Sequence, residues 1–451
     1  MKIKNAIVAG TGKSGISAAN LLTKHEVNVV LFDENEKRDV QQVKEKLHNP
    51  ELVDIELGKL SDKAYSEAEL MVISPGIPVD EPFVDEVRAH DIPVWSEIEL
   101  AYNYGKGMIA AITGTNGKTT TTALVGEIAK AYNDSTIVVG NIGIPYTELA
   151  DTTTDDSFTV AEISSFQLET IIDFHPHVSA VLNLTPDHLN RHYTFENYGN
   201  VKKSIAKNQT ADDYMVLNYD DEYTKKMAEG YAVKPIFFSR KEKPAGGVYV
   251  EDGSIVLEDK GEKLHILDLK DLILLGDHNV ENVLAACAIS YYMGIPIPVI
   301  EKVATSFKAV EHRIEYVDTI DGVDYYNDSK GTNPDAAIKG IKAMVKPTYL
   351  IGGGYDKGSE YDEWINAFDG KVKELILIGQ TADKIEACAH KLGFMNTVKL
   401  DNLEEAVKHC HDKAENGDAV LLSPACASWG QFDNYEQRGR MFKEYVLSFK
   451  E

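Results

Sequence analysis

One stretch of the chain limits its fold more than any other: Met108-Ile-Ala-Ala-Ile-Thr-Gly-Thr-Asn-Gly-Lys-Thr-Thr120. Its first five residues form an apolar run typical of a buried parallel strand, and residues 119–131 carry apolar side chains at helical spacing. Gly114, Gly117 and Lys118 lie between the two segments. A strand, a glycine turn and a helix beside a lysine form a phosphate site, because backbone N–H groups, the helix N-terminus and the ammonium group attract the anion.

This loop differs from the usual pattern at one position. Ile112 stands five residues before Gly117, where a glycine is usual, so the sequence predicts a variant phosphate-binding loop. The hydroxyl of Thr119, next to the lysine, is a candidate ligand of Mg²⁺. The alternative is a glycine-rich turn between a strand and a helix, without a ligand.

Composition narrows the class of protein. A chain of 451 residues exceeds one ordinary hydrophobic core, so several domains are expected. A net charge of −26 disfavours nucleic acid and membrane surfaces as partners. The four cysteines show neither a CxxC pair nor zinc spacing, which favours a reducing cytoplasm. The sequence also lacks an apolar run that could span a bilayer or serve as the core of a signal peptide.

A second glycine motif, Gly10-Thr-Gly12-Lys-Ser-Gly15, follows a predicted strand at 5–9 and precedes a predicted helix that runs to Leu22. A further strand at 27–32 leads to Asp33. The spacing matches the dinucleotide fingerprint, so an NAD(P) site is an alternative at this point. A glycine turn before a helix can, however, bind any diphosphate.

Two other segments lie before the phosphate-binding loop. The turn Ser74-Pro-Gly-Ile77 follows the apolar run 70–73 and is either another ligand loop at the same sheet edge or a plain Pro-Gly turn. Residues 102–107, aromatic and glycine-rich, are predicted to be a linker between domains.

Polar residues follow several later strands. The predicted strand 158–162 ends in Glu162, the strand 178–182 is followed by His188, and Asn141 follows another short strand. The alternation of strands and helices predicts a doubly wound α/β domain, in which these side chains meet at one edge of the sheet. Glu162 could instead be a solvated charge and His188 a packed histidine, but beside a phosphate loop metal ligation is the better interpretation.

Later segments supply further candidates. A basic helix is predicted at 197–209, and three short strands follow within 247–266. Asn279 and Asn282 lie three residues apart on one helix face, where they could contact a base edge or simply cap a turn. A third α/β unit begins near Glu311, with polar loops after its strands.

Taken in order, these motifs resemble the Mur ligase family of ATP-dependent amide-forming ligases. The resemblance rests on Thr113-Gly-Thr-Asn-Gly-Lys-Thr-Thr120, Glu162-Ile-Ser-Ser-Phe-Gln, Asn183-Leu-Thr-Pro-Asp-His188, His278-Asn279 to Asn282, His312-Arg313 and Asn327-Asp-Ser-Lys330. The ending Leu422-Ser-Pro-Ala-Cys-Ala-Ser428, through Phe432 to Arg438-Gly439, resembles the members that add D-glutamate.

The resemblance implies three α/β domains: a Rossmann-like domain at 1–106 for a UDP substrate, a central ATP-binding domain with a mostly parallel sheet at 107–309, and a Rossmann-like domain at 310–451 for an amino acid. It implies that ATP converts the carboxylate of UDP-N-acetylmuramoyl-L-alanine to an acyl phosphate, which D-glutamate then attacks, in peptidoglycan precursor synthesis. It further implies two Mg²⁺ sites, with Mn²⁺ able to substitute, and a cytoplasmic monomer.

The same resemblance assigns residues. The nucleotide would contact Gly114, Thr115, Asn116, Gly117, Lys118, Thr119, Thr120, Asn279, Asn282, Arg313 and Asp328. The UDP substrate would contact Gly12, Lys13, Ser14, Asp33, Ser74, Gly76, Asn141 and His188. D-Glutamate would lie among Lys330, Thr332, Lys357, Ser428, Trp429 and Tyr435.

Lys118, Glu162, His188 and Lys203 would be the catalytic group, and Thr119, Glu162, His188 and Lys203 the metal ligands. An ammonium group cannot ligate Mg²⁺, and the family uses a carbamylated lysine instead. Lys203 matches that position, and Lys202 is its rival. Two positions depart from the family pattern: Glu34-Asn35 after Asp33, where uracil contacts are expected, and Gly430, where relatives often carry an acid.

Three rivals stay open. Folylpolyglutamate synthetase or another Mur ligase would share Lys118 and Glu162 but would need a different first turn and a different C-terminal segment. An NAD-binding oxidoreductase would leave Lys118, Glu162, His188 and Asp328 without a role. A non-catalytic nucleotide-binding module would not need the complete set of metal ligands.

Overall fold

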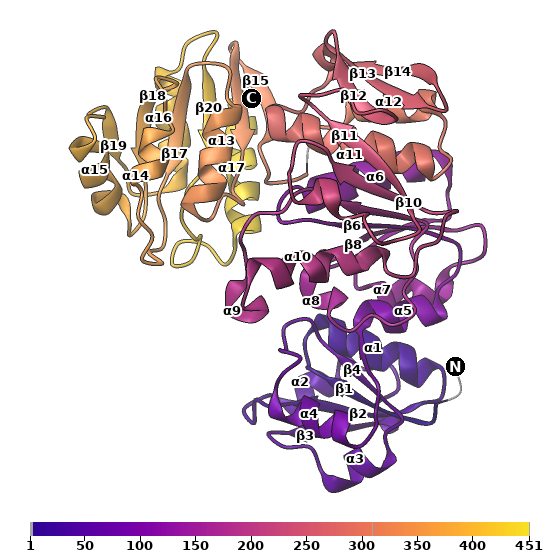
Figure 1. Ribbon diagram of the computed structural model, residues 1–451. Helices are drawn as coiled ribbons and strands as arrows, with labels where there is room; N and C mark the ends of the chain where they lie inside the picture. The colour runs from indigo at the N-terminus through magenta and orange to yellow at the C-terminus, as the bar shows by residue number, and fades with distance from the viewer. Residues whose placement is uncertain (1–2, 309, 451) are drawn as a thin grey trace. The chain divides into compact units, whose positions relative to one another are not determined.

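Three β-sheets follow one another along the chain in the computed structural model, which describes residues 3–308 and 310–450 (Figure 1). The first sheet has five parallel strands in the order β3-β2-β1-β4-β5. Its strands are β1 (Asn5–Ala9), β2 (Asn28–Asp33), β3 (Val53–Leu57), β4 (Leu70–Ile73) and β5 (Val94–Ser96). Its helices are α1 (Lys13–Lys24), α2 (Val40–Lys44), α3 (Asp62–Glu67), α4 (Pro82–Ala89) and α5 (Glu97–Tyr104).

Alternation along the strands explains why helices cover both faces of this sheet. Ala6 and Val8 of β1 belong to a core cluster with α1, whereas Ile7 and Ala9 belong to a second cluster with α4. A strand that is buried on both faces must carry apolar side chains on both, and residues 6–9 of β1 are all apolar and buried.

The second sheet has nine strands in the order β14-β13-β12-β11-β10-β9-β6-β8-β7. The strands from β6 to β12 pair in parallel, and the last two pair antiparallel. The strands are β6 (Met108–Thr113), β7 (Thr136–Gly140), β8 (Phe158–Glu162), β9 (Val178–Val181), β10 (Tyr214–Asn218), β11 (Lys234–Ser239), β12 (Gly247–Glu251), β13 (Ser254–Asp259) and β14 (Glu262–Asp268). The helices are α6 (Lys118–Tyr132), α7 (Tyr146–Leu149), α8 (Ser165–Leu168), α9 (Leu189–His192), α10 (Phe195–Lys203), α11 (Asp277–Tyr292) and α12 (Ile297–Ser306).

The third sheet has six strands in the order β15-β16-β20-β17-β18-β19, parallel except for the edge strand β15. The strands are β15 (Glu315–Ile320), β16 (Val323–Asn327), β17 (Thr348–Gly352), β18 (Val372–Leu377), β19 (Thr397–Lys399) and β20 (Ala419–Leu422). The helices are α13 (Pro334–Ala343), α14 (Asp362–Asn366), α15 (Ala382–Lys391), α16 (Leu403–Lys413) and α17 (Tyr435–Ser448).

The predicted α/β class, with three domains and a mostly parallel central sheet, is confirmed. By internal contacts the first two sheets form one compact unit and the third sheet forms another, with the segment Leu272–Val280 grouped with the third. The domain boundaries after residues 106 and 309 stay predictions, and residue 309 lies outside the described residues. Among the described residues, no helix combines the length and apolar character needed to cross a bilayer.

Two predicted segments differ from the structure. The linker predicted at 102–107 is helical up to Tyr104, because Ser96 caps α5 and the side chains of Ile98 and Leu100 are buried. The helix predicted at 197–209 ends as a regular helix at Lys203, and a 3₁₀ turn, Ser204–Ala206, follows.

A buried carboxylate of α5 joins the first sheet to the second. Glu99 is 0% exposed, and its oxygens accept hydrogen bonds from the backbone N–H groups of Ile172, Asp173 and Phe174 at 2.9, 2.7 and 3.0 Å. Three donors on one carboxylate compensate for its removal from water.

Replacing Glu99 by glutamine should therefore destabilise the protein. The amide keeps one acceptor oxygen and sets an NH₂ group against N–H donors, so we expect unfolding to need about 2–4 kcal/mol less. The measurement is the urea midpoint, with Glu127→Gln as a control, since Glu127 lies on the exposed face of α6. Equal midpoints for the two variants would refute this account of Glu99.

Candidate functional site

The glycine loop after β6 has a backbone conformation that depends on its two glycines. Gly114 and Gly117 have φ values of 149° and 83°, which favour glycine. A Cβ atom on Gly117 would also lie 2.3 Å from the side-chain oxygen of Asn282 in α11. The structure thus brings the carboxamide of Asn282 to the loop. Asn279 lies three residues earlier in the same helix, where its amide donates to Leu275 O at 2.7 Å.

The segment after β9 fixes the loop from the other side. The amide N–H of Asn116 donates to Asn183 Oδ1 at 2.8 Å, and Asn183 Nδ2 donates back to Asn116 O at 3.0 Å. Thr115 Oγ1 lies 3.1 Å from both Thr185 O and the hydroxyl of Tyr198. Asn183 and Tyr198 are absent from the predicted site residues, and a role in shaping a loop leaves no spacing signal in the sequence.

Two lysines converge on this loop. Lys118 Nζ donates to Gly114 O at 2.9 Å and to Thr115 O at 2.8 Å, and Lys202 Nζ donates to the same Gly114 O at 2.9 Å. Lys202 is 2% exposed, and burial, together with the charge of Lys118, holds the pKa of its ammonium well below the usual range. Thr119 and Thr120 lie in the first turn of α6, directly after Lys118.

Lys203, predicted to be the metal-binding lysine, lies elsewhere. Its Nζ donates to Glu229 O at 2.7 Å and lies 5.1 Å from the centre of the Tyr231 ring. Adjacent helical residues point about 100° apart, so only one of the two lysines can face the loop. In the structure that lysine is Lys202.

The predicted carboxylate Glu162 ends β8, next to β6, and its side chain is 2% exposed. Asn141 Nδ2 donates to Glu162 Oε1 at 3.1 Å, so two residues predicted from separate strand ends are in contact. The charge of Glu162 also opposes the lowering of the pKa of Lys202. Carboxylate, carboxamide and lysine therefore share one edge of the second sheet.

The histidine predicted to bind metal, His188, directly precedes α9 and has a left-handed φ of 52°. Its ring is half exposed and packs edge-on against Phe166 at 4.8 Å. The centre of the Phe166 ring also lies 4.3 Å from the guanidinium carbon of Arg191. The terminal nitrogens of this arginine donate to Pro75 O and Ile77 O, each at 2.8 Å. Arg191, absent from the prediction, connects the His188 segment to the Ser74 turn of the first sheet.

The two turns of the first sheet that were predicted to hold a substrate pack on each other. A Cβ on Gly10 would lie 2.6 Å from Ser74 Oγ, and one on Gly15 would lie 1.8 Å from Gly10 O. Lys13 Nζ donates at 2.5 Å to Gly143 O, next to the Asn141 segment. A cavity of about 620 Å³ opens beside Gly12 and Lys13, whereas Ser14 and Gly76 do not line it.

Asp33 bonds to the Gly10 turn and to the segment that follows β2. It accepts hydrogen bonds from Thr11 N at 3.2 Å, Thr11 Oγ1 at 2.5 Å and Arg38 Nε at 3.2 Å. Burial raises the pKa of Asp33, but the hydrogen bonds from Thr11 and Asn35 and the nearby Arg38 outweigh it and lower the pKa overall. The carboxylate at the end of β2 is therefore held against the Gly10 turn.

In the unit built on the third sheet, Asp328 follows β16 and is 6% exposed. Ser423 Oγ donates to its carboxylate at 2.6 Å. Burial raises the pKa of Asp328 to about 7, although Ser423 and the nearby Arg313 cation oppose the rise.

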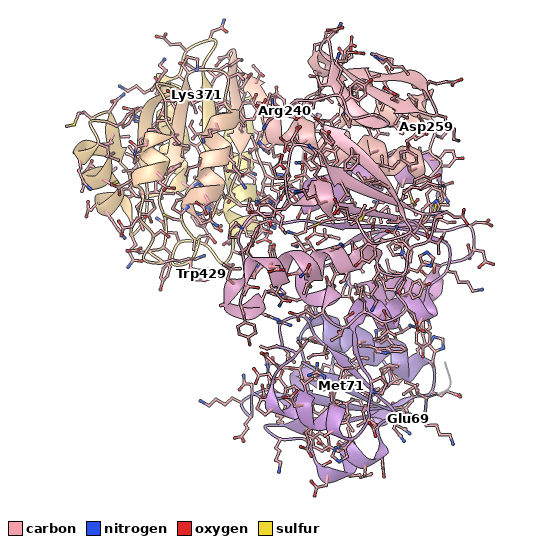
Figure 2. All side chains as sticks on the ribbon, in the orientation of Figure 1. Glu69, Met71, Arg240, Asp259, Lys371 and Trp429 are labelled. Atoms are coloured by element: carbon pink, nitrogen blue, oxygen red, sulfur yellow. The ribbon has the colours of Figure 1, made fainter. Side chains whose placement is uncertain are left out.

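Most of the residues predicted around an amino acid gather in two groups in this unit. Lys330 Nζ donates to the hydroxyl of Tyr435 at 3.0 Å, and Thr332 N donates to Lys330 O at 2.8 Å. Lys357 Nζ lies 4.9 Å from the centre of the half-exposed Trp429 ring, labelled in Figure 2.

Ser428, beside that tryptophan, is buried. Gly430, which departs from the family pattern, has a φ of 88°, where glycine is favoured over an acidic side chain.

Family models match three consecutive parts of the chain. They are described as a Mur ligase MurD-like N-terminal domain at residues 4–96, a Mur ligase middle domain at 112–290, and a Mur ligase glutamate ligase domain at 312–426. The three ranges contain the first, second and third sheets in turn, except that residues 108–111 of β6 precede the middle range.

Relatives of similar length match throughout. The chain is 56% identical to a UDP-N-acetylmuramoylalanine–D-glutamate ligase of Lachnospira eligens and 51% identical to one of Lachnoclostridium phytofermentans, with 99% of each chain covered. A solved UDP-N-acetylmuramate–alanine ligase of Thermotoga maritima superposes with a TM-score of 0.60 at 19% identity, covering 99% of this chain and 100% of that one. At that identity the structural likeness concerns the fold alone.

Proposed function

The chain belongs to the Mur ligase family, and from this premise we propose that it uses ATP to join D-glutamate to UDP-N-acetylmuramoyl-L-alanine. The reaction releases ADP and phosphate and belongs to peptidoglycan precursor synthesis. The relatives matched over nearly the whole chain carry the name of this activity. The structural observation that supports it most is that Lys118 and Lys202 both bond to Gly114 O of the glycine loop, while the charge of Glu162 acts on Lys202.

The chemistry explains why these groups are needed. A carboxylate does not react with an amine because its leaving group would be oxide. When a carboxylate oxygen attacks the γ-phosphorus of ATP, the bond to ADP breaks and an acyl phosphate forms. The amine of D-glutamate then attacks the acyl carbon, loses a proton, and expels phosphate. Lys118 and the loop N–H groups would hold the phosphates and offset the charge of the transferred group.

The donor set fits magnesium. Mg²⁺ prefers oxygen ligands and is usually held by few protein groups together with phosphates and water. The hydroxyl of Thr119 and the carboxylate of Glu162 would hold one ion, and His188 would contribute to a second. When bound, the ion would neutralise phosphate charge. Mn²⁺, which accepts similar ligands, would substitute.

We assign the carbamylated lysine expected at the second metal site to Lys202 rather than Lys203. Carbamate forms when a neutral amine attacks CO₂, creating an N–C bond and losing a proton. Burial favours the neutral amine of Lys202. The side chain of Lys203 instead bonds to the backbone carbonyl of Glu229. The carbamate would be an anionic oxygen ligand, which an ammonium group cannot be.

The remaining residues divide between the substrates. Gly12, Lys13, Ser14, Asp33 and the Ser74–Gly76 turn would hold the UDP end, with Asn141 and His188 nearer the reacting carboxylate. Asn279, Asn282, Arg313 and Asp328 would contact the nucleotide. Lys330, Thr332, Lys357, Ser428, Trp429 and Tyr435 would surround D-glutamate, whose two carboxylates suit the cations of Lys330 and Lys357. The protein would act as a cytoplasmic monomer.

Phosphate release tests this function directly. With ATP, Mg²⁺ and UDP-N-acetylmuramoyl-L-alanine, D-glutamate should raise the rate by about a hundredfold or more over L-glutamate, L-lysine or no amino acid. The physical reason is that the two carboxylates and the amine of the other enantiomer cannot all occupy the same contacts. Turnover with L-amino acids only, or reduction of NAD, would rule the proposal out.

A further inference from the structure

A buried cationic side chain bonds to two loops that follow strands of the third sheet. Arg438, in α17, is 1% exposed. Its Nε donates to Ser329 Oγ at 3.0 Å, one terminal nitrogen donates to Ser329 O at 2.8 Å, and both terminal nitrogens reach Cys426 O at 3.3 Å. Among the residues that the structure describes, no carboxylate forms an ion pair with this guanidinium.

A buried charge raises the free energy of the folded protein unless a group of opposite charge compensates for it. Moving a cation out of water is poorly compensated by neutral acceptors alone. Burial lowers the pKa of Arg438 to about 10, so it keeps its proton at neutral pH. Asp328, the nearby carboxyl group, is bonded to Ser423 instead, and its raised pKa leaves it only partly charged.

The guanidinium bonds to two of the loops that carry the proposed D-glutamate residues and lies beside a third. Ser329 precedes Lys330, and Cys426 lies two residues before Ser428. A Cβ atom on Gly354 would lie 3.4 Å from a terminal nitrogen of Arg438, and Gly354 begins the loop that leads to Lys357. Arg438 itself lies three residues after Tyr435, whose backbone oxygen accepts from Ser329 Oγ at 2.8 Å.

We propose that Arg438 is a positioning residue for the amino-acid site, holding these loops in register and supplying positive charge whose counter-ion is the dicarboxylate substrate. The planar fork of guanidinium is suited to this, because it can bond two carbonyl oxygens and a hydroxyl in fixed directions. The inference rests on the proposed reaction with D-glutamate.

Steady-state kinetics of two variants test it. Arg438→Met keeps the length of the side chain and removes charge and donors, and Arg438→Lys keeps the charge but loses the fork. We expect the KM for D-glutamate to rise on the order of tenfold to a hundredfold for Met and less for Lys. The KM values for ATP and for UDP-N-acetylmuramoyl-L-alanine should change by less than about twofold.

Phe442→Leu is the matched control, since Phe442 is fully buried one helical turn further along α17 and carries no charge. It should lower stability while leaving the KM for D-glutamate unchanged. A Met variant with the control's KM for D-glutamate, or with all three KM values raised together, would overturn the proposal.

If Arg438→Met does not fold, the kinetics of Arg438→Lys test the role of Arg438. A rise confined to the KM for D-glutamate supports the assignment, and an unchanged value overturns it. The parent protein separates failure of the proposed reaction from failure of the proposed role of Arg438. If the parent protein shows no D-glutamate-dependent phosphate release, the proposed reaction is wrong.

Discussion

Replacing Lys118 by alanine is expected to reduce D-glutamate-dependent phosphate release by about a thousandfold or more. Lys118 is the cation at the start of α6, and its Nζ rests on two carbonyl oxygens of the loop that would hold the phosphates. Removing it leaves the charge that develops on the transferred phosphoryl group without its nearest protein cation. The reacting acid would then stay an inert carboxylate.

The measurement is the single-turnover rate with saturating ATP and acceptor, which separates loss of chemistry from weaker binding. Lys130→Ala is the control, because Lys130 lies near the other end of α6 and pairs with Glu127 on the surface. The control should retain the parent rate. If Lys118→Ala joins the two substrates at the parent rate, the proposed phosphoryl transfer at this loop is incorrect.

The second large effect is expected at Lys202. Lys202→Ala should lose activity by about a hundredfold or more, because it removes the anionic oxygens that a carbamate would offer to the second metal ion. Formate or acetate should restore part of the activity, since the shortened side chain leaves room for a small carboxylate. Lys203→Ala should keep most of the parent activity, because its ammonium contacts Glu229 O rather than the loop.

A spectroscopic measurement tests the assignment of the carbamate to Lys202 without relying on turnover. With ¹³C-labelled bicarbonate, a carbamate carbon signal should be present in the parent protein and in Lys203→Ala and absent from Lys202→Ala. Loss of the signal and of rescuable activity in Lys203→Ala, with Lys202→Ala unaffected, would restore the assignment that the sequence alone suggested.

Much of the fold was predictable because its signals are local. The strand and helix predicted at 108–112 and 119–131 are found at Met108–Thr113 and Lys118–Tyr132. An apolar run and the two glycines that interrupt it determine these elements without help from the rest of the chain. The linker predicted at 102–107 was partly wrong because tertiary contacts, not local signals, determine this segment. Burial of Ile98 and Leu100 stabilises a helix that continues into residues resembling a linker.

Local sequence patterns were sufficient to predict the glycine loop after β6, the α/β class and the set of polar residues at the strand ends. Which of those residues meet depended on tertiary structure. Lys202 and Lys203 are indistinguishable in the sequence, but the packing of α10 turns one toward Gly114 O and the other toward Glu229 O. Arg438 belongs to the C-terminal motif that carries the family resemblance, but the motif gives it no role, because its partners lie 109 and 12 residues away along the chain. Local periodicity sets which elements form, whereas only the folded chain decides which side chains share a site, since those contacts join residues far apart in sequence.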